Sequence, residues 1–141
     1  MARFTIAVDQ SPDPLDVRTL VEGLNGHAFA QAGATPPESL AVFLYDDGGK
    51  IVGGVSGRIW DGVLDISILW VHEDYRGEGY GRQLMAAAEA EGLKRGCELS
   101  ELRTFDYQAP EFYKQIGYDE YHVVEGWPRG RRRHFFRKRL G

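Results

Sequence analysis

Short apolar runs recur along the chain, and turns rich in glycine and aspartate separate them. Runs of this length are typical of β-strands, and the Asp-Gly turns at residues 46–49 and 61–62 are typical of hairpins. The pattern predicts strands near residues 4–8, 40–45, 51–59, 63–71, 98–105, 118–124 and 134–140. The hairpin turns further predict that the runs at 40–45, 51–59 and 63–71 form antiparallel neighbours.

Helical segments interrupt this series of strands. The stretch 16–30 follows Asp13-Pro14, which suits a helix start, and the stretch 82–95 is rich in alanine. A short helix is predicted at 110–116, where apolar residues recur at three- and four-residue spacing before Gly117. Together these elements predict an α/β fold in a single domain over residues 1–141, with a mixed, mostly antiparallel sheet flanked by helices.

Composition excludes several classes of protein. Hydrophobic residues make up 43% and aromatic residues 12% of the 141 residues, as in globular proteins. No run approaches the about 18 apolar residues that span a bilayer, so we expect no membrane partner. The four histidines are scattered and the one cysteine is Cys97, so we expect no metal site and no internal disulfide. A lone cysteine fits a reducing compartment, and we expect a cytoplasmic protein.

Charge is spread unevenly. All 21 acidic residues lie at or before Glu125, whereas residues 129–141 hold 7 of the 17 lysines and arginines. Such a basic run can bind nucleic acid. Phe135, Phe136 and Leu140 lie inside it, however, and basic residues commonly protect an edge strand from aggregation. We therefore favour a solvated terminal strand and expect no nucleic-acid partner, while an exposed edge strand makes a homodimer plausible.

The most informative motif joins the strand at 63–71 to the helix at 82–95. Residues 76–82 read Arg-Gly-Glu-Gly-Tyr-Gly-Arg, with glycine at alternate positions. Glycine adopts positive φ without steric cost, so backbone N–H groups can converge there. The helix that follows leaves its first N–H groups unbonded and presents its positive dipole end. The motif therefore predicts a site for phosphate or pyrophosphate.

Two familiar phosphate loops do not fit this motif. A Walker loop ends in Gly-Lys-Ser/Thr, and no lysine in this chain precedes serine or threonine. The dinucleotide fingerprint places its third glycine three residues after the second, which here is Arg82, because Gly81 comes one residue too early. The predicted anion site therefore belongs to another class.

Arg-Gly-x-Gly-x-Gly preceded by Val-x-x-x-Tyr resembles the acyl-CoA pyrophosphate loop of the GNAT superfamily of N-acetyltransferases. Residues 109–118, Ala-x-x-Phe-Tyr-x-x-x-Gly-Tyr, resemble the second signature of the same superfamily, in the family's order and separation. The resemblance implies direct transfer of an acetyl group from acetyl-CoA to a primary amine of a small molecule or protein. It also implies a sheet splayed between its fourth and fifth strands, here 63–71 and 98–105.

The resemblance also implies roles for individual residues. Tyr113 stands where the family has its general acid, and a tyrosine pKa of about 10 suits protonation of a leaving thiolate. A backbone N–H near 69–71 would stabilise the thioester oxygen. The residues expected to contact acetyl-CoA are Leu69, Trp70, Val71, Arg76, Gly77, Glu78, Gly79, Tyr80, Gly81, Arg82, Asp106 and Phe112.

The general base departs from the family pattern. Many relatives carry an acidic residue on the fourth strand where this chain has Ser67. Asp65 lies two residues earlier, on the same face by the period of two, and is the candidate base, directly or through water. A hairpin-end residue or a substrate contact is the alternative reading of Asp65. Asp106 stands where relatives often have asparagine, and its carboxylate could attract a cationic amine.

Two other functions stay open at this point. A non-catalytic acyl-CoA-binding sensor is supported by the missing acidic residue at Ser67 and opposed by Tyr113. A nucleic-acid- or protein-binding domain would instead use the basic strand at the C-terminus.

Overall fold

The computed structural model describes residues 3–33 and 36–141. The chain divides into two units, Met1–Pro36 and Pro37–Gly141. The expectation of one domain over residues 1–141 therefore stays a prediction.

The first unit contains helix α1 (Pro14–Ala32). Its start follows the prediction, because the Asp13 carboxylate accepts a hydrogen bond from the Leu15 N–H at 2.8 Å and caps the helix. The strand expected at residues 4–8 is wrong, since residues 3–9 have no regular secondary structure. A strand needs a neighbouring strand for its backbone hydrogen bonds, and among the described residues of this unit the only other element is a helix.

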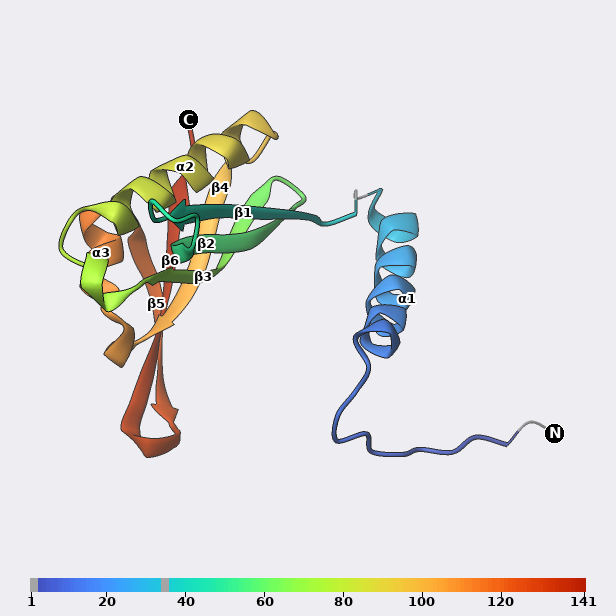
Figure 1. Cartoon of the computed structure of the whole chain (residues 1–141). Coiled ribbons are helices and arrows are strands. Elements are labelled where there is room, and N and C mark those ends of the chain that lie inside the picture. The colour runs from blue at the N-terminus through green and yellow to red at the C-terminus, as the bar shows by residue number, and fades with distance from the viewer. Residues whose placement is uncertain (1–2, 34–35) are drawn as a thin grey trace. The chain divides into compact units, whose positions relative to one another are not determined.

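The second unit is built on a six-stranded sheet with two helices (Figure 1). Its elements are β1 (Glu38–Tyr45), β2 (Ile51–Trp60), β3 (Val63–Val71), η1 (Glu73–Tyr75), α2 (Tyr80–Lys94), β4 (Leu99–Phe105), η2 (Asp106–Gln108), α3 (Pro110–Gln115), β5 (Asp119–Trp127), η3 (Pro128–Gly130) and β6 (Arg131–Arg139). The strand order is β1-β2-β3-β4-β6-β5, and β3 and β4 run parallel while the other neighbours are antiparallel. The predicted mixed α/β fold with a mostly antiparallel sheet is confirmed.

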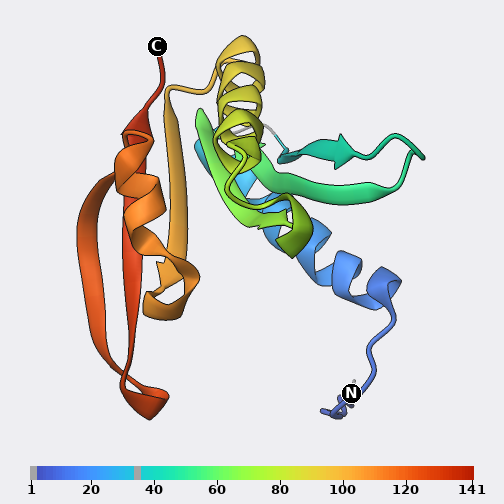
Figure 2. The ribbon, with the colours of Figure 1, turned by 60° about the vertical axis from the view of Figure 1, so that its left-hand side comes forward.

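The sheet opens between β3 and β4. Their pairing runs from Val63 opposite Leu99 to Ile66 opposite Leu102. β3 continues to Val71 and β4 to Phe105, yet in the described part of the chain these later residues do not pair with each other. Figure 2 shows β4 and β6 turning away from β3. The splay between the strands that the sequence predicted at 63–71 and 98–105 is therefore confirmed.

A β-bulge lies at the same point of β3. Ser56 pairs with Ile68 and the next residue, Gly57, pairs with Ile66, so Ser67 is the extra residue. The bulge breaks the period of two that placed Asp65 and Ser67 on one face. Gly57 is required here because a side chain at this position would overlap the Asp65 carbonyl oxygen.

The hydrophobic core lies between the sheet and α2. Leu84, Met85 and Ala88 on α2 are almost fully buried together with Leu64 of β3 and Phe136 of β6. These contacts hold the first turn of α2 close to the point where β3 and β4 separate.

A buried polar network adds a second link between α2 and the β4–β6 half of the sheet. The Tyr118 hydroxyl donates to Glu89 of α2 at 2.9 Å and lies 2.8 Å from the Ser100 hydroxyl of β4. Lys138 of β6 donates to the same carboxylate at 2.7 Å. Because α2 also packs on the β1–β3 half, this network fixes the spacing of the two halves across the splay.

Candidate active site

A pocket of about 650 Å³ lies between the end of β3 with the loop that follows it and η2 with α3. It belongs entirely to the second unit. Its lining residues are Leu69, Trp70, Val71, Tyr75, Arg76, Gly77, Gly79, Tyr80, Gly81, Arg82, Tyr107, Gln108, Ala109, Phe112, Tyr113 and Gln115.

The glycine loop presents a row of free backbone donors to this pocket. Gly77 and Gly79 have φ of 78° and 85°, and apart from the adjacent residues no atom of the described chain lies within 4 Å of where a Cβ would stand at either residue. Within the described residues, the N–H groups of residues 77–82 make no backbone hydrogen bond, and Gln83 is the first to bond back into the loop. With no acidic residue in the first turn of α2, this donor set fits a phosphate or pyrophosphate.

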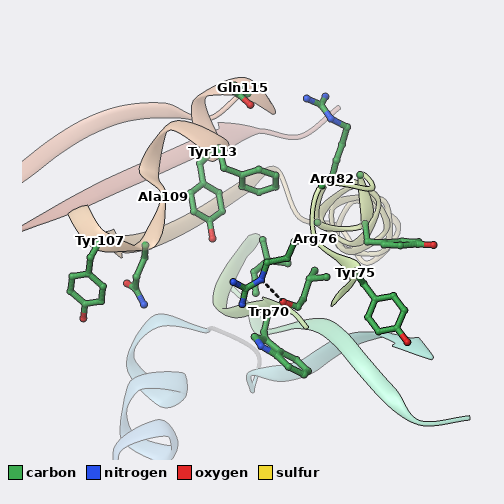
Figure 3. A pocket seen from close by; sticks show the side chains of 16 residues that line it. Trp70, Tyr75, Arg76, Arg82, Tyr107, Ala109, Tyr113 and Gln115 are labelled. Atoms are coloured by element: carbon green, nitrogen blue, oxygen red, sulfur yellow. Dashed lines mark hydrogen bonds between the residues drawn. The ribbon is translucent and has the colours of Figure 1, made fainter. Parts of the chain in front are cut away.

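A hydrogen bond from the Arg76 side chain links this loop to the end of β3. Its Nε donates to the Val71 carbonyl oxygen at 2.8 Å (Figure 3). Gly81 stands at the other end of the loop, where a Cβ would lie 3.4 Å from the Phe112 ring of α3. The loop is therefore held between β3 and α3, and Gly81 permits the close approach of α3.

The splayed end of β3 supplies further donors. The His72 N–H donates to the Val52 carbonyl oxygen on β2 at 2.8 Å. Because N–H groups alternate in direction along a strand, those of Leu69 and Val71 point away from β2, toward the side from which β4 has separated. They are the candidates for the one backbone N–H near 69–71 that the family resemblance implies as a donor to the thioester oxygen, and this role stays a prediction.

Tyr113 reaches the pocket from α3. Its ring packs against Phe112, Tyr118 and Phe136, with centroids 5.2, 6.1 and 5.8 Å away. Its hydroxyl points into the pocket in Figure 3, and within the described residues it makes no hydrogen bond. Burial raises the pKa of Tyr113 above its usual value of 10.0, so the hydroxyl stays protonated at neutral pH and can act as a proton donor.

Most of the site residues predicted from the sequence gather at this pocket. Asp65, Glu78 and Asp106 do not line it. The Asp65 carboxylate accepts a hydrogen bond from Arg103 at 3.2 Å, in the stretch where β3 and β4 are still paired. Glu78 and Asp106 are exposed. The individual roles given to all these residues stay predictions.

Sequence reasoning missed several residues of the pocket wall, namely Tyr75, Tyr107, Gln108, Ala109 and Gln115. Tyr75 and Ala109 belong to the two quoted motifs, so a signal for them was present. Gln108 has no motif, yet its side chain accepts from the Phe105 N–H at 3.0 Å and so shapes η2. Only the three-dimensional course of η2 places Tyr107 and Gln108 against the pocket.

Comparison with known proteins decides the family. The family model of the acetyltransferase (GNAT) domain matches residues 38–120. The chain belongs to the GNAT acetyltransferase family. It is thus an acyltransferase enzyme, and members of this family use acetyl-CoA.

Two relatives are similar over most of their length. The chain is 35% identical over 108 residues to a blasticidin-S acetyltransferase of Streptomyces morookaense, covering 76% of this chain and 79% of the relative. It is also 36% identical to an acetyltransferase from Bacillus cereus ATCC 14579, whose crystal structure is known. The match covers 95% of this chain and 98% of the Bacillus cereus chain, with a TM-score of 0.79.

A more distant structure shares the fold. A Bacillus anthracis str. Ames protein in complex with acetyl coenzyme A is 18% identical, with a TM-score of 0.66 over 76% of this chain and 65% of that chain.

The described residues have neither a membrane-spanning helix nor a cluster of metal-ligating side chains. In residues 3–33 and 36–141, no helix is both long enough and apolar enough to cross a membrane. The same residues contain no group of three or more His, Cys, Asp or Glu side chains placed to hold a metal ion.

Proposed function

We propose that this chain transfers an acetyl group from acetyl-CoA directly to a primary amine. One observation carries the proposal: the free N–H groups of residues 77–82 and the hydroxyl of Tyr113 belong to the same pocket. The first is an anion site and the second a proton donor. The similarity to a blasticidin-S acetyltransferase supports a small molecule as the acceptor, while an amine of a protein stays the alternative.

The donor side of the site is assigned as follows. The backbone of residues 77–82 would hold the pyrophosphate at the positive end of α2, with Arg76 and Arg82 adding positive charge. Leu69, Trp70 and Val71 would form the wall beside the acyl end, with Phe112 opposite. Glu78 and Asp106, which are exposed, would contact more peripheral parts of the ligand.

Acetyl-CoA supplies an activated thioester, in which a C–N bond forms to the amine as the C–S bond breaks. The N–H groups of Leu69 and Val71 would stabilise the carbonyl oxygen as it gains negative charge. Tyr113 would protonate the departing sulfur. Asp65 would accept the proton that the amine loses, through a bridging water, because its carboxylate does not line the pocket.

The test is an acetyl-transfer assay with a panel of amines that includes blasticidin S. Thiol release that depends on both acetyl-CoA and an amine, with the acetylated product seen by mass spectrometry, is the expected result. If acetyl-CoA binds but no amine in a broad panel is acetylated, the proposal is wrong. The chain would then be the non-catalytic acyl-CoA sensor, which the missing acidic residue at Ser67 favours.

The contacts of the basic residues on β6 bear on the alternative of a nucleic-acid-binding domain. The basic residues of β6 are divided among separate contacts: Lys138 bonds to Glu89, Arg132 pairs with Glu125 at 3.3 Å, and Arg137 lies over the Tyr121 ring. This division weakens the case for a nucleic-acid surface. A cytoplasmic location and a homodimer stay predictions.

A further inference from the structure

Arginine side chains and aromatic rings form a cluster beside the pocket. The Arg131 guanidinium lies 4.8 Å from the centre of the Tyr107 ring. The Arg133 guanidinium lies 5.0 Å from the Phe105 ring and 5.5 Å from the Trp127 ring. Phe105 and Tyr107 stack nearly parallel, 5.5 Å apart. We call these five residues the arginine–aromatic platform. Because Tyr107 also lines the pocket, the platform is continuous with the pocket wall.

The two arginines of the platform are not neutralised. Within the described residues neither Arg131 nor Arg133 makes an ion pair or a side-chain hydrogen bond, and the Arg133 Nε is buried without a partner. Arg132, which lies between them in sequence, pairs instead with Glu125. Stacking uses the face of a guanidinium and leaves N–H donors along its edge. The platform thus holds two oriented positive groups that can receive an anion.

The platform lies on the side of the sheet opposite α2. His134 and Phe136 of β6 are buried, and Phe136 packs in the core with the α2 residues. Side chains alternate along a strand, so Arg131 and Arg133 share the other face. The phosphate loop opens α2 on the core side. A molecule held by the platform would therefore approach the splay from the face opposite the phosphate loop, as an acceptor must if the donor occupies the loop.

We infer that the arginine–aromatic platform binds the acceptor and selects an amine that carries a carboxylate on a planar ring. The ring would pack edge-on against Tyr107 and Trp127, because the two guanidiniums lie over their faces. Its carboxylate would accept hydrogen bonds from the N–H edges of Arg131 and Arg133. This inference rests on the proposed function, since it assigns the acceptor side of the same site.

The test compares two probes of nearly the same shape, of which only one carries a negatively charged group. p-(Aminomethyl)benzoate and p-(aminomethyl)benzamide share the ring and the amine, and only the benzoate carries a carboxylate. Titration calorimetry measures the dissociation constant of each with the whole chain saturated with CoA. Binding is measured without turnover, so the inference can fail while acetyl transfer succeeds, and the reverse.

The parent is expected to bind the benzoate at least about 10-fold more tightly than the benzamide, as a charge-assisted hydrogen bond would give. In the double variant Arg131→Gln/Arg133→Gln this preference should fall to within about twofold. The matched control Arg132→Gln should keep it. Because Arg131 is exposed, Arg131→Gln alone serves as a second variant that disturbs the fold least, and it should weaken the preference.

Several results would overturn the inference. One is a parent that does not prefer the benzoate, and another is a double variant that keeps the preference. Weaker binding of acetyl-CoA by the double variant would assign the two arginines to a phosphate of the donor instead. Equal loss in Arg132→Gln would show a general effect of net charge.

Discussion

The two ends of β3 are both extended but have different neighbours. From Val63 to Ile66 the strand pairs with β4, and the Asp65–Arg103 ion pair adds a side-chain contact between the two strands. Beyond the bulge at Ser67 the strand loses β4, and the N–H groups of Leu69 and Val71 face an open pocket. The backbone N–H groups of the same strand are thus used in pairing where its edge is paired and are available to a ligand where its edge is free.

The largest effect on activity is expected when the proposed proton donor beside the splayed end of β3 is removed. Tyr113→Phe should lower kcat by about 10²- to 10⁴-fold, the usual loss of a general acid, because the ring and its packing remain. The dissociation constant for acetyl-CoA should change little. Tyr121→Phe is the matched control and should keep kcat, since its hydroxyl bonds to Glu101 and not to the pocket. A kcat within about threefold of the parent for Tyr113→Phe would make Tyr113 structural.

Asp65 tests whether the paired end takes any part in the chemistry. If its carboxylate accepts the amine proton through water, Asp65→Asn should lower kcat by about 10²-fold, at the lower end of acid–base effects. Arg103→Gln removes the partner and keeps the carboxylate, so it should retain most of the activity. If Asp65→Asn changes only the free energy of unfolding, by about 1 kcal/mol or less, the residue is a structural ion-pair member.

Gly57 tests the packing that creates the bulge. Gly57→Ala should lower the free energy of unfolding by about 1–3 kcal/mol, because the added Cβ meets the Asp65 carbonyl and must push β2 and β3 apart. Denaturant titration measures this change. Gly48→Ala, in the β1–β2 turn, is the control and should cost no more than about 0.5 kcal/mol. Equal stability of Gly57→Ala and the parent would contradict the tight contact.

The smallest expected effect is a displaced pH profile. In the proposed mechanism protonated Tyr113 is the active form, and burial raises its pKa above the usual 10.0, so this form persists to higher pH. The alkaline fall of kcat should therefore begin above the pH range of an ordinary tyrosine, and Tyr113→Phe should lack this limb. A fall that begins below that range would mean that another group is titrating.

The sequence predicted those features that are determined by residues close to one another along the chain. The loop at residues 76–82 and the helix that carries Tyr113 depend on glycine φ angles and helix caps, which neighbouring residues determine. Both are found where they were expected. The bulge at Ser67 depends instead on the pairing register of two strands, which no local pattern encodes.

The predictions that failed also depended on strand pairing, which local sequence patterns do not encode. Residues 4–8 have the composition of a strand but lack a partner strand in their unit. The alternation that related Asp65 to Ser67 fails because the bulge lies between the paired and the splayed ends. The arginine–aromatic platform joins Tyr107 to Arg131 through the pairing of β4 with β6, so composition predicted a basic strand but not its contact with the pocket wall.

The central claim is that the free backbone of the glycine loop binds the pyrophosphate of acetyl-CoA. Titration calorimetry of Gly79→Val tests it most directly, because a β-branched residue resists a φ of 85° and its side chain would enter the open space in front of the loop. Glu73→Ala, in the exposed turn before the loop, is the control and should bind acetyl-CoA nearly as the parent does. We expect Gly79→Val to bind acetyl-CoA at least about 100-fold more weakly than the parent, equivalent to about 2.7 kcal/mol. Binding of acetyl-CoA by Gly79→Val as tight as by the parent would contradict it.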